Sequence, residues 1–198
     1  MRINTVKKAR KDQGTCSGCG KEIKRGDSYT WIKFRYGGKT KKCGSCIFKA
    51  SDMTSSDKLS RIYAAQENAV EAIEDLDVSD NIEDISSVLE ELASEVREVA
   101  QEYQESADNI RESFTESSTA DECEEKAQVI EDWADECEDP GFEEFEFDES
   151  DECKNRKDDG LTKAELKEAV DTARAEALNE WFICQQSMAV EVAGNCPV

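Results

Sequence analysis

The chain has 198 residues and a formal net charge of −22, with 47 acidic residues, 25 basic residues and no histidine. This length allows one large domain or two small ones. The lack of histidine removes the commonest general base and leaves thiolates and carboxylates as the side chains that can bind zinc. Because we find neither a phosphate-binding loop nor a nucleophile motif, we expect a protein that is not an enzyme.

The charge of the chain changes sign at about residue 50. Residues 1–50 contain 14 Lys and Arg against 3 Asp and Glu, a net charge of +11, and the remainder has a net charge of −33. A basic surface is typical of proteins that bind phosphates, and an acidic one favours basic protein partners. We therefore predict a mostly α-helical protein in which a small basic module precedes an acidic helical region.

The cellular compartment is predicted from two patterns. No stretch approaches the roughly 18 apolar residues of a membrane span, and the first residues lack the apolar core of a secretory signal. The odd number of cysteines, nine, argues against a complete disulfide framework. We expect a cytoplasmic protein with reduced thiols and no membrane partner.

Four cysteines of the basic module have the spacing of a metal site. Cys16 and Cys19 form one C-x2-C pair, and Cys43 and Cys46 form a second pair after a spacer of 23 residues. Two such pairs can provide four thiolate ligands to a tetrahedral zinc ion, and glycines in and beside the pairs permit tight turns. We predict one structural zinc ion. The alternatives are disulfides, unligated thiols, an iron–sulfur cluster or a rubredoxin-like iron.

A β-hairpin is predicted between the two cysteine pairs. Residues 28–36 alternate as a strand does, and Gly37-Gly38 followed by residues 39–42 predicts a turn and a return strand. One face of the first strand, which we expect to cover the zinc site, carries Ile32, Phe34 and Tyr36. The other face mixes aromatic and basic side chains, a combination that stacks on bases and neutralises phosphates. Its members are Tyr29, Trp31, Lys33 and Arg35.

The residues from Cys16 to Tyr29 read Cys-x-x-Cys-Gly-x-x-Ile-x-x-Gly-x-x-Tyr. This pattern resembles the treble-clef zinc fingers, including those of poly(ADP-ribose) polymerases and of small phage-encoded proteins. The resemblance covers about residues 12–50 and implies a zinc site, with the host cytoplasm as compartment if the chain is phage-encoded. The polymerase finger has a histidine as third ligand where this chain has Cys43, so its recognition of DNA breaks is not transferred to this chain.

Further basic side chains surround the hairpin, on a flexible arm over residues 7–11 and in turns that carry Lys21, Lys24 and Arg25. We predict that nucleic acid contacts the hairpin and the arm. The alternatives are that these side chains dock on the acidic half of the chain or only keep the module soluble. The predicted nucleic-acid contacts are Trp31, Lys33, Arg35, Lys7, Lys8, Arg10, Lys11, Lys39, Lys41 and Lys42.

Long helices are predicted after the module, because no glycine occurs between Gly44 and Gly141. A first helix starts at about Leu59, and Asp77–Asp80 forms a turn with an N-cap. A second helix over residues 82–114 has apolar residues at alternating spacings of three and four, which predicts a coiled-coil seam. That seam pairs either with the preceding helix in an antiparallel hairpin or with a second copy in a homodimer.

Two more helices are predicted, over residues 120–138 and from a Thr162/Glu165 capping box to about Val190. Residues 139–160 are predicted to form an acidic loop, whose phenylalanines pack on the helices or bind a partner. These are Phe142, Phe145 and Phe147. One apolar face of the last helix is predicted to carry Leu166, Val170, Ala173, Ala177, Trp181, Cys184 and Met188.

Two further cysteines, Cys123 and Cys137, are predicted to pack as small apolar side chains. Cys123 and Cys137 lie on the same face of the third helix, but about 21 Å apart, too far to share an ion. The alternative is a second metal site around Cys137 and Cys153. The sequence does not assign Cys184 and Cys196 a role.

The predicted segments are a basic zinc-binding module at 1–50, an acidic helical hairpin or coiled coil at 51–138, an acidic loop at 139–160, and a helix with a tail at 161–198. We expect a non-enzymatic zinc-binding protein that contacts nucleic acid or a nucleoprotein complex through the module. The helical arm would engage a protein with a basic surface. The alternative is an acidic inhibitor that mimics DNA, with a purely structural zinc module.

Overall fold

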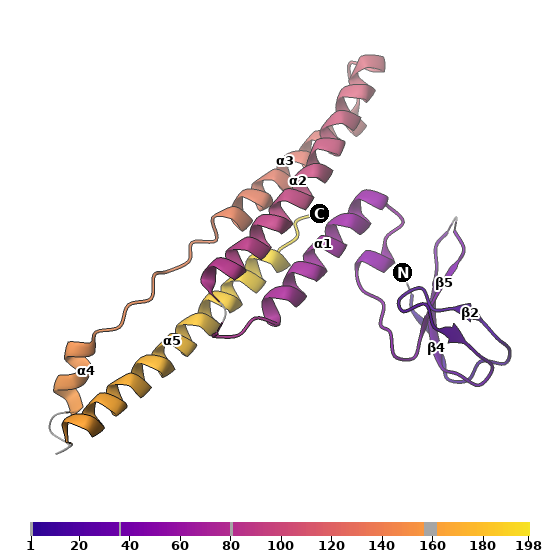
Figure 1. The fold of residues 1–198 in the computed structure, drawn as a ribbon. Coiled ribbons are helices and arrows are strands. Elements are labelled where there is room, and N and C mark those ends of the chain that lie inside the picture. Colours follow the sequence, from indigo (N-terminus) through magenta and orange to yellow (C-terminus); the bar gives the residue numbers. More distant parts are fainter. Residues whose placement is uncertain (1, 36, 80, 157–161) are drawn as a thin grey trace. The chain divides into compact units, whose positions relative to one another are not determined.

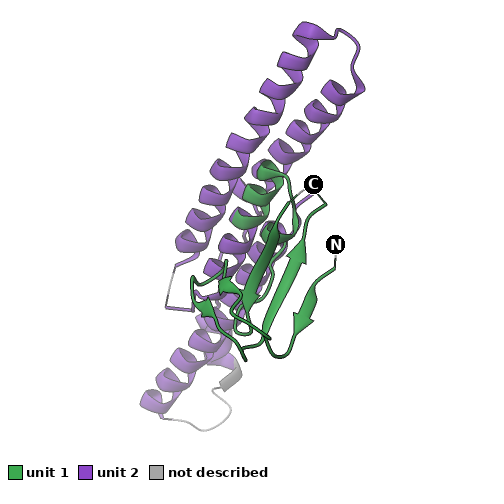
Figure 2. Cartoon of the chain, turned by 90° about the vertical axis from the view of Figure 1, so that its right-hand side faces the viewer, with its two compact units in different colours: residues 1–64 green, residues 65–198 purple. Residues whose placement is uncertain are grey.

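The computed structural model describes residues 2–35, 37–79, 81–156 and 162–198, and most of them are helical, as predicted (Figure 1). The chain forms two compact units, Met1–Ala64 and Ala65–Val198 (Figure 2). The first unit contains the strands and the cysteine pairs, and the second contains most of the helices. The first helix runs through the boundary between them.

The first unit contains two small antiparallel sheets. Strands β1 (Asn4–Val6), β4 (Tyr29–Lys33) and β5 (Lys39–Cys43) form one sheet in the order β1-β4-β5, and β2 (Gly14–Thr15) pairs with β3 (Glu22–Ile23). The short helix η1 (Ser51–Met53) follows. The predicted hairpin is therefore present as β4 and β5, but β4 ends at Lys33, and Tyr36 lies outside the described residues.

The segment before the first cysteine pair is ordered by backbone hydrogen bonds. Strand β1 pairs with β4, with Asn4 opposite Trp31. Ala9 is 4% exposed, and its N–H donates to Asp27 O at 2.8 Å while its carbonyl accepts from Gly26 N at 2.9 Å. The prediction of a flexible arm is therefore wrong, because this segment is hydrogen-bonded to the sheet and to the turn after β3.

Within the residues that the structure describes, five helices follow: α1 (Asp57–Glu74), α2 (Ile82–Ser113), α3 (Ser118–Glu138), α4 (Glu149–Arg156) and α5 (Lys163–Gly194). Helices α2 and α3 lie side by side in an antiparallel hairpin, and α5 contacts both (Figure 1). Most of the predicted apolar stripe of α2 is buried within the single chain, but Phe114, the last residue of the predicted helix, lies beyond α2 and is exposed. The buried members are Ile85, Leu89, Leu92, Val96, Val99, Tyr103 and Ala107.

The main partner of α2 is α3, which follows it, and not the preceding helix as predicted. Small side chains on α3, including Ala127 and Ala134, are buried and let the two helices approach closely. Arg97 of α2 adds ion pairs with three carboxylates of α3, Glu131 at 3.2 Å, Asp135 at 2.5 Å, and Glu138. A hydrogen bond from Arg97 lowers the pKa of the Glu138 carboxyl group.

Helix α5 begins at the predicted capping box, where Glu165 N donates to Thr162 Oγ1 at 3.4 Å and Thr162 N donates to Glu165 Oε2 at 2.8 Å. The predicted apolar face is wrong in the second half of the helix, because Cys184 is exposed and Trp181 only half-buried. The buried side chains of α5 are Val170, Phe182, Gln185, Ala189 and Ala193.

The segment between α3 and α4 covers the face of α5 that carries Trp181. The indole Nε1 of Trp181 donates to Glu143 O at 3.0 Å, and its ring centroid lies 5.7 Å from that of Phe145. Phe145 of the predicted loop therefore packs on α5, which agrees with the packing alternative for this phenylalanine. The loop prediction itself is corrected by α4, whose first N–H groups, of Ser150 and Asp151, donate to Asp148 Oδ1.

The N-cap of helix α2 is Asn81, whose backbone N–H donates to Asp84 Oδ2 at 2.8 Å. The predicted N-cap, Asp80, lies outside the described residues. Gln186 of α5 donates to the carbonyls of Ile73 at 2.7 Å and Leu76 at 2.8 Å, so it satisfies acceptors at the end of α1. Within the described ranges, no helix is both long and apolar enough to cross a membrane.

The burial of α2 generates a test of the second unit. Leu92 is 2% exposed, so Leu92→Asp would place a carboxylate in the apolar stripe at a cost of several kcal/mol. We expect circular dichroism to show a large loss of helix and of thermal stability. Glu91→Ala, at the exposed neighbouring position, is the control and should leave the melting curve nearly unchanged. Equal stability of the two variants would contradict the assigned core.

Candidate metal centre

The four predicted ligands meet between the β2–β3 turn and the end of β5. The Sγ atoms of Cys16, Cys19, Cys43 and Cys46 all lie within 4.8 Å of one another. Cys43 Sγ is 3.7 Å from Cys19 Sγ and 3.6 Å from Cys46 Sγ. A disulfide needs about 2.05 Å. Four sulfurs at about 2.3 Å from a tetrahedral zinc ion are about 3.8 Å apart. This group could hold a metal ion, and its dimensions fit zinc.

Two tight turns present the sulfurs. In the first turn, Gly20 has a φ of +70° and its N–H donates to Cys16 O at 3.0 Å, a conformation that suits glycine. In the second, Cys46 N donates to Cys43 O at 3.0 Å. Cys16 Sγ also accepts from Cys43 N at 3.2 Å and from Gly18 N at 3.4 Å. Such N–H groups orient a thiolate ligand and stabilise its charge.

The pKa values of the Cys16 and Cys46 thiols are shifted in opposite directions. Burial raises the pKa of Cys16, but hydrogen bonds from the backbone N–H groups of Cys43, Cys19 and Gly18 outweigh burial and lower the pKa to about 6. Hydrogen bonding with the sulfurs of Cys43 and Cys19 instead raises the pKa of Cys46 to about 12. A divalent cation would displace the protons of the thiols by compensating the negative charge of the thiolates.

A small apolar cluster surrounds the sulfurs. Cys16, Cys43 and Ile23 are buried together, and Tyr29 packs against them. Tyr29 is the partner of Cys43 across β4 and β5, so the two side chains share a face of the sheet. The prediction that the Ile32 face covers the cysteines is therefore wrong, because Ile32 is fully buried on the opposite face.

Lys42 is a structural residue and not a nucleic-acid contact. It is 7% exposed, and its ammonium donates to Asp52 Oδ2 at 2.5 Å and to Ile47 O at 3.0 Å. These bonds tie β5 to the segment that follows the second cysteine pair. We therefore remove Lys42 from the predicted nucleic-acid contacts, since its charge is already compensated inside the first unit.

The other hairpin contacts lie on one face of the sheet, where Trp31 pairs with Lys41 and Lys33 pairs with Lys39. Lys41 Nζ donates to Gln13 O at 2.7 Å, and Lys39 Nζ lies 4.1 Å from the centroid of the Trp31 ring. The structure thus brings these predicted contacts together but gives several of them internal partners. The exposed members of the predicted set are Lys7, Lys8, Arg10, Lys11, Lys33, Arg35 and Lys39.

The second metal site considered around Cys137 and Cys153 is not found in the part of the chain that the structure describes. There, the four-cysteine group is the one set of three or more cysteine or carboxylate ligands that come together. Cys137 is 1% exposed, and burial raises the pKa of its thiol to about 12. It therefore packs as an apolar side chain, as predicted.

The environment of Lys42 generates a test. Lys42→Met keeps the length of the side chain but leaves Asp52 without its partner, so we expect a destabilisation of about 1–3 kcal/mol. Thermal unfolding followed by circular dichroism would measure it. Lys24→Met, at an exposed position, is the matched control. A Lys42→Met variant as stable as this control would contradict the structural role of Lys42.

Comparison with protein-family models, with curated proteins and with solved structures finds no match for this chain. The function is therefore argued from the cysteine group and from the charged surfaces.

Proposed function

We propose that this chain is a non-enzymatic zinc-binding protein that contacts nucleic acid, by itself or within a nucleoprotein complex, through its first unit. The observation that carries the proposal is the excess of cations on that unit, since residues 1–64 contain 16 basic and 5 acidic residues. Most of the predicted basic contacts are exposed. A surface of this charge attracts the phosphate backbone regardless of base sequence.

Zinc has a structural role in this proposal. The four sulfurs leave no open coordination position, and the segments on both sides of the site are short strands and turns. Such a unit gains folding free energy from the metal, which holds together elements distant in sequence. The fold that the metal stabilises would be related to the treble-clef fingers, with the second cysteine pair after the hairpin.

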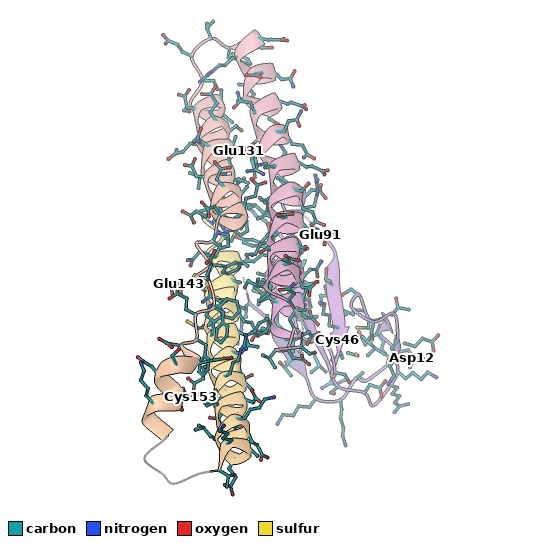
Figure 3. The ribbon with its side chains drawn as sticks, turned by 60° about the vertical axis from the view of Figure 1, so that its left-hand side comes forward. Asp12, Cys46, Glu91, Glu131, Glu143 and Cys153 are labelled. Carbon is teal, nitrogen blue, oxygen red and sulfur yellow. The ribbon has the colours of Figure 1, made fainter. Side chains whose placement is uncertain are left out.

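The second unit would bind a protein with a basic surface. An open groove of about 980 Å³ lies between α2 and α3 and is lined by carboxylates of both helices, among them Glu98 and Glu131. Glu131 is labelled on α3 in Figure 3. This groove also favours the second candidate function, an inhibitor whose carboxylates replace the phosphates of DNA on a basic protein. In that case the full chain would not bind DNA.

The metal assignment predicts about one equivalent of zinc per chain after purification under reducing conditions. Cys43→Ser should lose the metal, because one of four thiolate ligands is removed. Cys184→Ser, at an exposed cysteine outside the group, should retain it. Elemental analysis of the three proteins measures this. No zinc in the wild-type protein would refute the assignment, and two equivalents would bring back a second site.

The nucleic-acid proposal predicts that the full chain binds a labelled DNA duplex at low salt and releases it as salt rises. With about four phosphate contacts, the affinity should fall by about 10² between 50 and 200 mM salt. Fluorescence anisotropy at several salt concentrations measures this slope. Absence of binding at every salt concentration would leave the DNA-mimic candidate.

A further inference from the structure

Two basic segments that are separate in sequence are joined in the first unit. Residues 7–11 follow β1, and residues 24–27 form the turn after β3. Ala9 makes backbone hydrogen bonds with both Gly26 and Asp27, and Arg25 N donates to Asp12 Oδ1 at 2.7 Å. These three bonds fix the segments beside each other. In Figure 3, Asp12 and Cys46 are labelled at two different places in the first unit.

The joined segments carry a dense positive charge that points to solvent. We name the six cations together the cation cluster, and all six side chains are exposed. They are Lys7, Lys8, Arg10, Lys11, Lys24 and Arg25. The buried methyl group of Ala9 lies between Lys8 and Arg10 and holds this part of the chain against the unit.

The nearby carboxylates compensate only part of this charge. Asp12 and Asp27 each accept a backbone N–H, from Arg25 at 2.7 Å and from Lys24 at 2.8 Å. The ion pair of Glu22 with Lys24 is 3.7 Å long, and both side chains are exposed. Exposed pairs of this kind contribute little. Six cations near three carboxylates therefore leave a positive potential that a polyanion would relieve.

The hairpin face is the weaker candidate for the same contact. Its Lys41 and Lys39 already interact with the Gln13 carbonyl and with the Trp31 ring. An approaching phosphate would have to compete with these partners. Among the cluster cations, by contrast, Lys24 alone has a side-chain partner, the exposed Glu22, within the ranges that the structure describes.

We propose that the cation cluster, and not the β4–β5 hairpin, is the principal contact with the phosphate backbone of nucleic acid. This inference rests on the proposed function and locates it. Because backbone hydrogen bonds already order both segments, binding costs less conformational entropy than the ordering of a flexible arm would. Contacts to phosphates carry no sequence information, so binding should be insensitive to base sequence.

The test compares two pairs of charge-neutralising substitutions in the zinc-loaded full chain. Lys8→Gln with Arg10→Gln removes two charges from the cluster, and Lys33→Gln with Lys39→Gln removes two from the hairpin. The probe is a labelled 20-base-pair DNA duplex titrated at several salt concentrations. The cluster pair should reduce the slope of log K against log salt by about 1.8, since each lost phosphate contact contributes about 0.9. The hairpin pair should change it little.

A gain of affinity provides a second readout. Asp12→Asn keeps an oxygen that can accept from Arg25 N but removes a negative charge from the cluster. We expect the duplex to bind roughly two- to fivefold more tightly at low salt, where charges are screened least. Zinc content and circular dichroism should equal those of the wild-type protein. Unchanged or weaker binding by this folded variant would count against the cluster.

The outcomes separate the inference from the proposed function. Wild-type protein that binds no duplex at any salt concentration overturns the proposed function and the inference with it. Binding that the hairpin pair weakens as much as, or more than, the cluster pair overturns the inference alone. Equal competition by anionic phospholipid vesicles, with the same dependence on the cluster pair, overturns nucleic acid as the specific ligand.

Discussion

The first unit depends on the approach of four sulfur atoms to within 4.8 Å. Its strands are two to five residues long, and the apolar cluster around the sulfurs contains only Ile23 and Tyr29 besides cysteines. So few buried side chains cannot offset the entropy of ordering the unit. The pKa of Cys16 is lowered and that of Cys46 is raised, and a divalent cation bound to both sulfurs would stabilise the deprotonated form of each. Metal binding and folding of this unit should therefore be one event.

The second unit is strongly acidic, and its carboxylates repel one another. Two features oppose this repulsion: the apolar stripe of α2, which is buried against α3 and α5, and a few cations placed beside carboxylates. Arg97 alone contacts three carboxylates of α3, and the hydrogen bond that it donates to Glu138 is the largest cause of the raised pKa of its guanidinium group. Such pairs contribute modestly when exposed, so burial of the stripe is the main source of stability.

The features that could be predicted are those that depend on residues close together in the sequence. The spacing of Cys16 and Cys43 with their partners, the stripe of α2 and the capping box at Thr162 are short-range signals, and the structure contains all three. The errors concern contacts between distant segments. Nothing near Lys42 in sequence indicates its partner Asp52, and the face of α5 depends on where residues 139–148 pack. Residues 7–11 are likewise held in place by a distant segment, because Ala9 makes backbone hydrogen bonds with Gly26 and Asp27.

A net charge of −22 does not by itself decide whether the chain binds a polyanion. At physiological ionic strength the Debye length is about 8 Å, so charges at larger distances are largely screened. The potential that a phosphate meets is then set by the side chains within one or two residue widths of the contact. At the cation cluster, whose two segments are joined by the hydrogen bonds of Ala9 and Asp12, six cations would make this local potential positive. Carboxylates farther from the contact than the Debye length would act mainly at low salt, where they would slow the approach of nucleic acid without removing the local attraction.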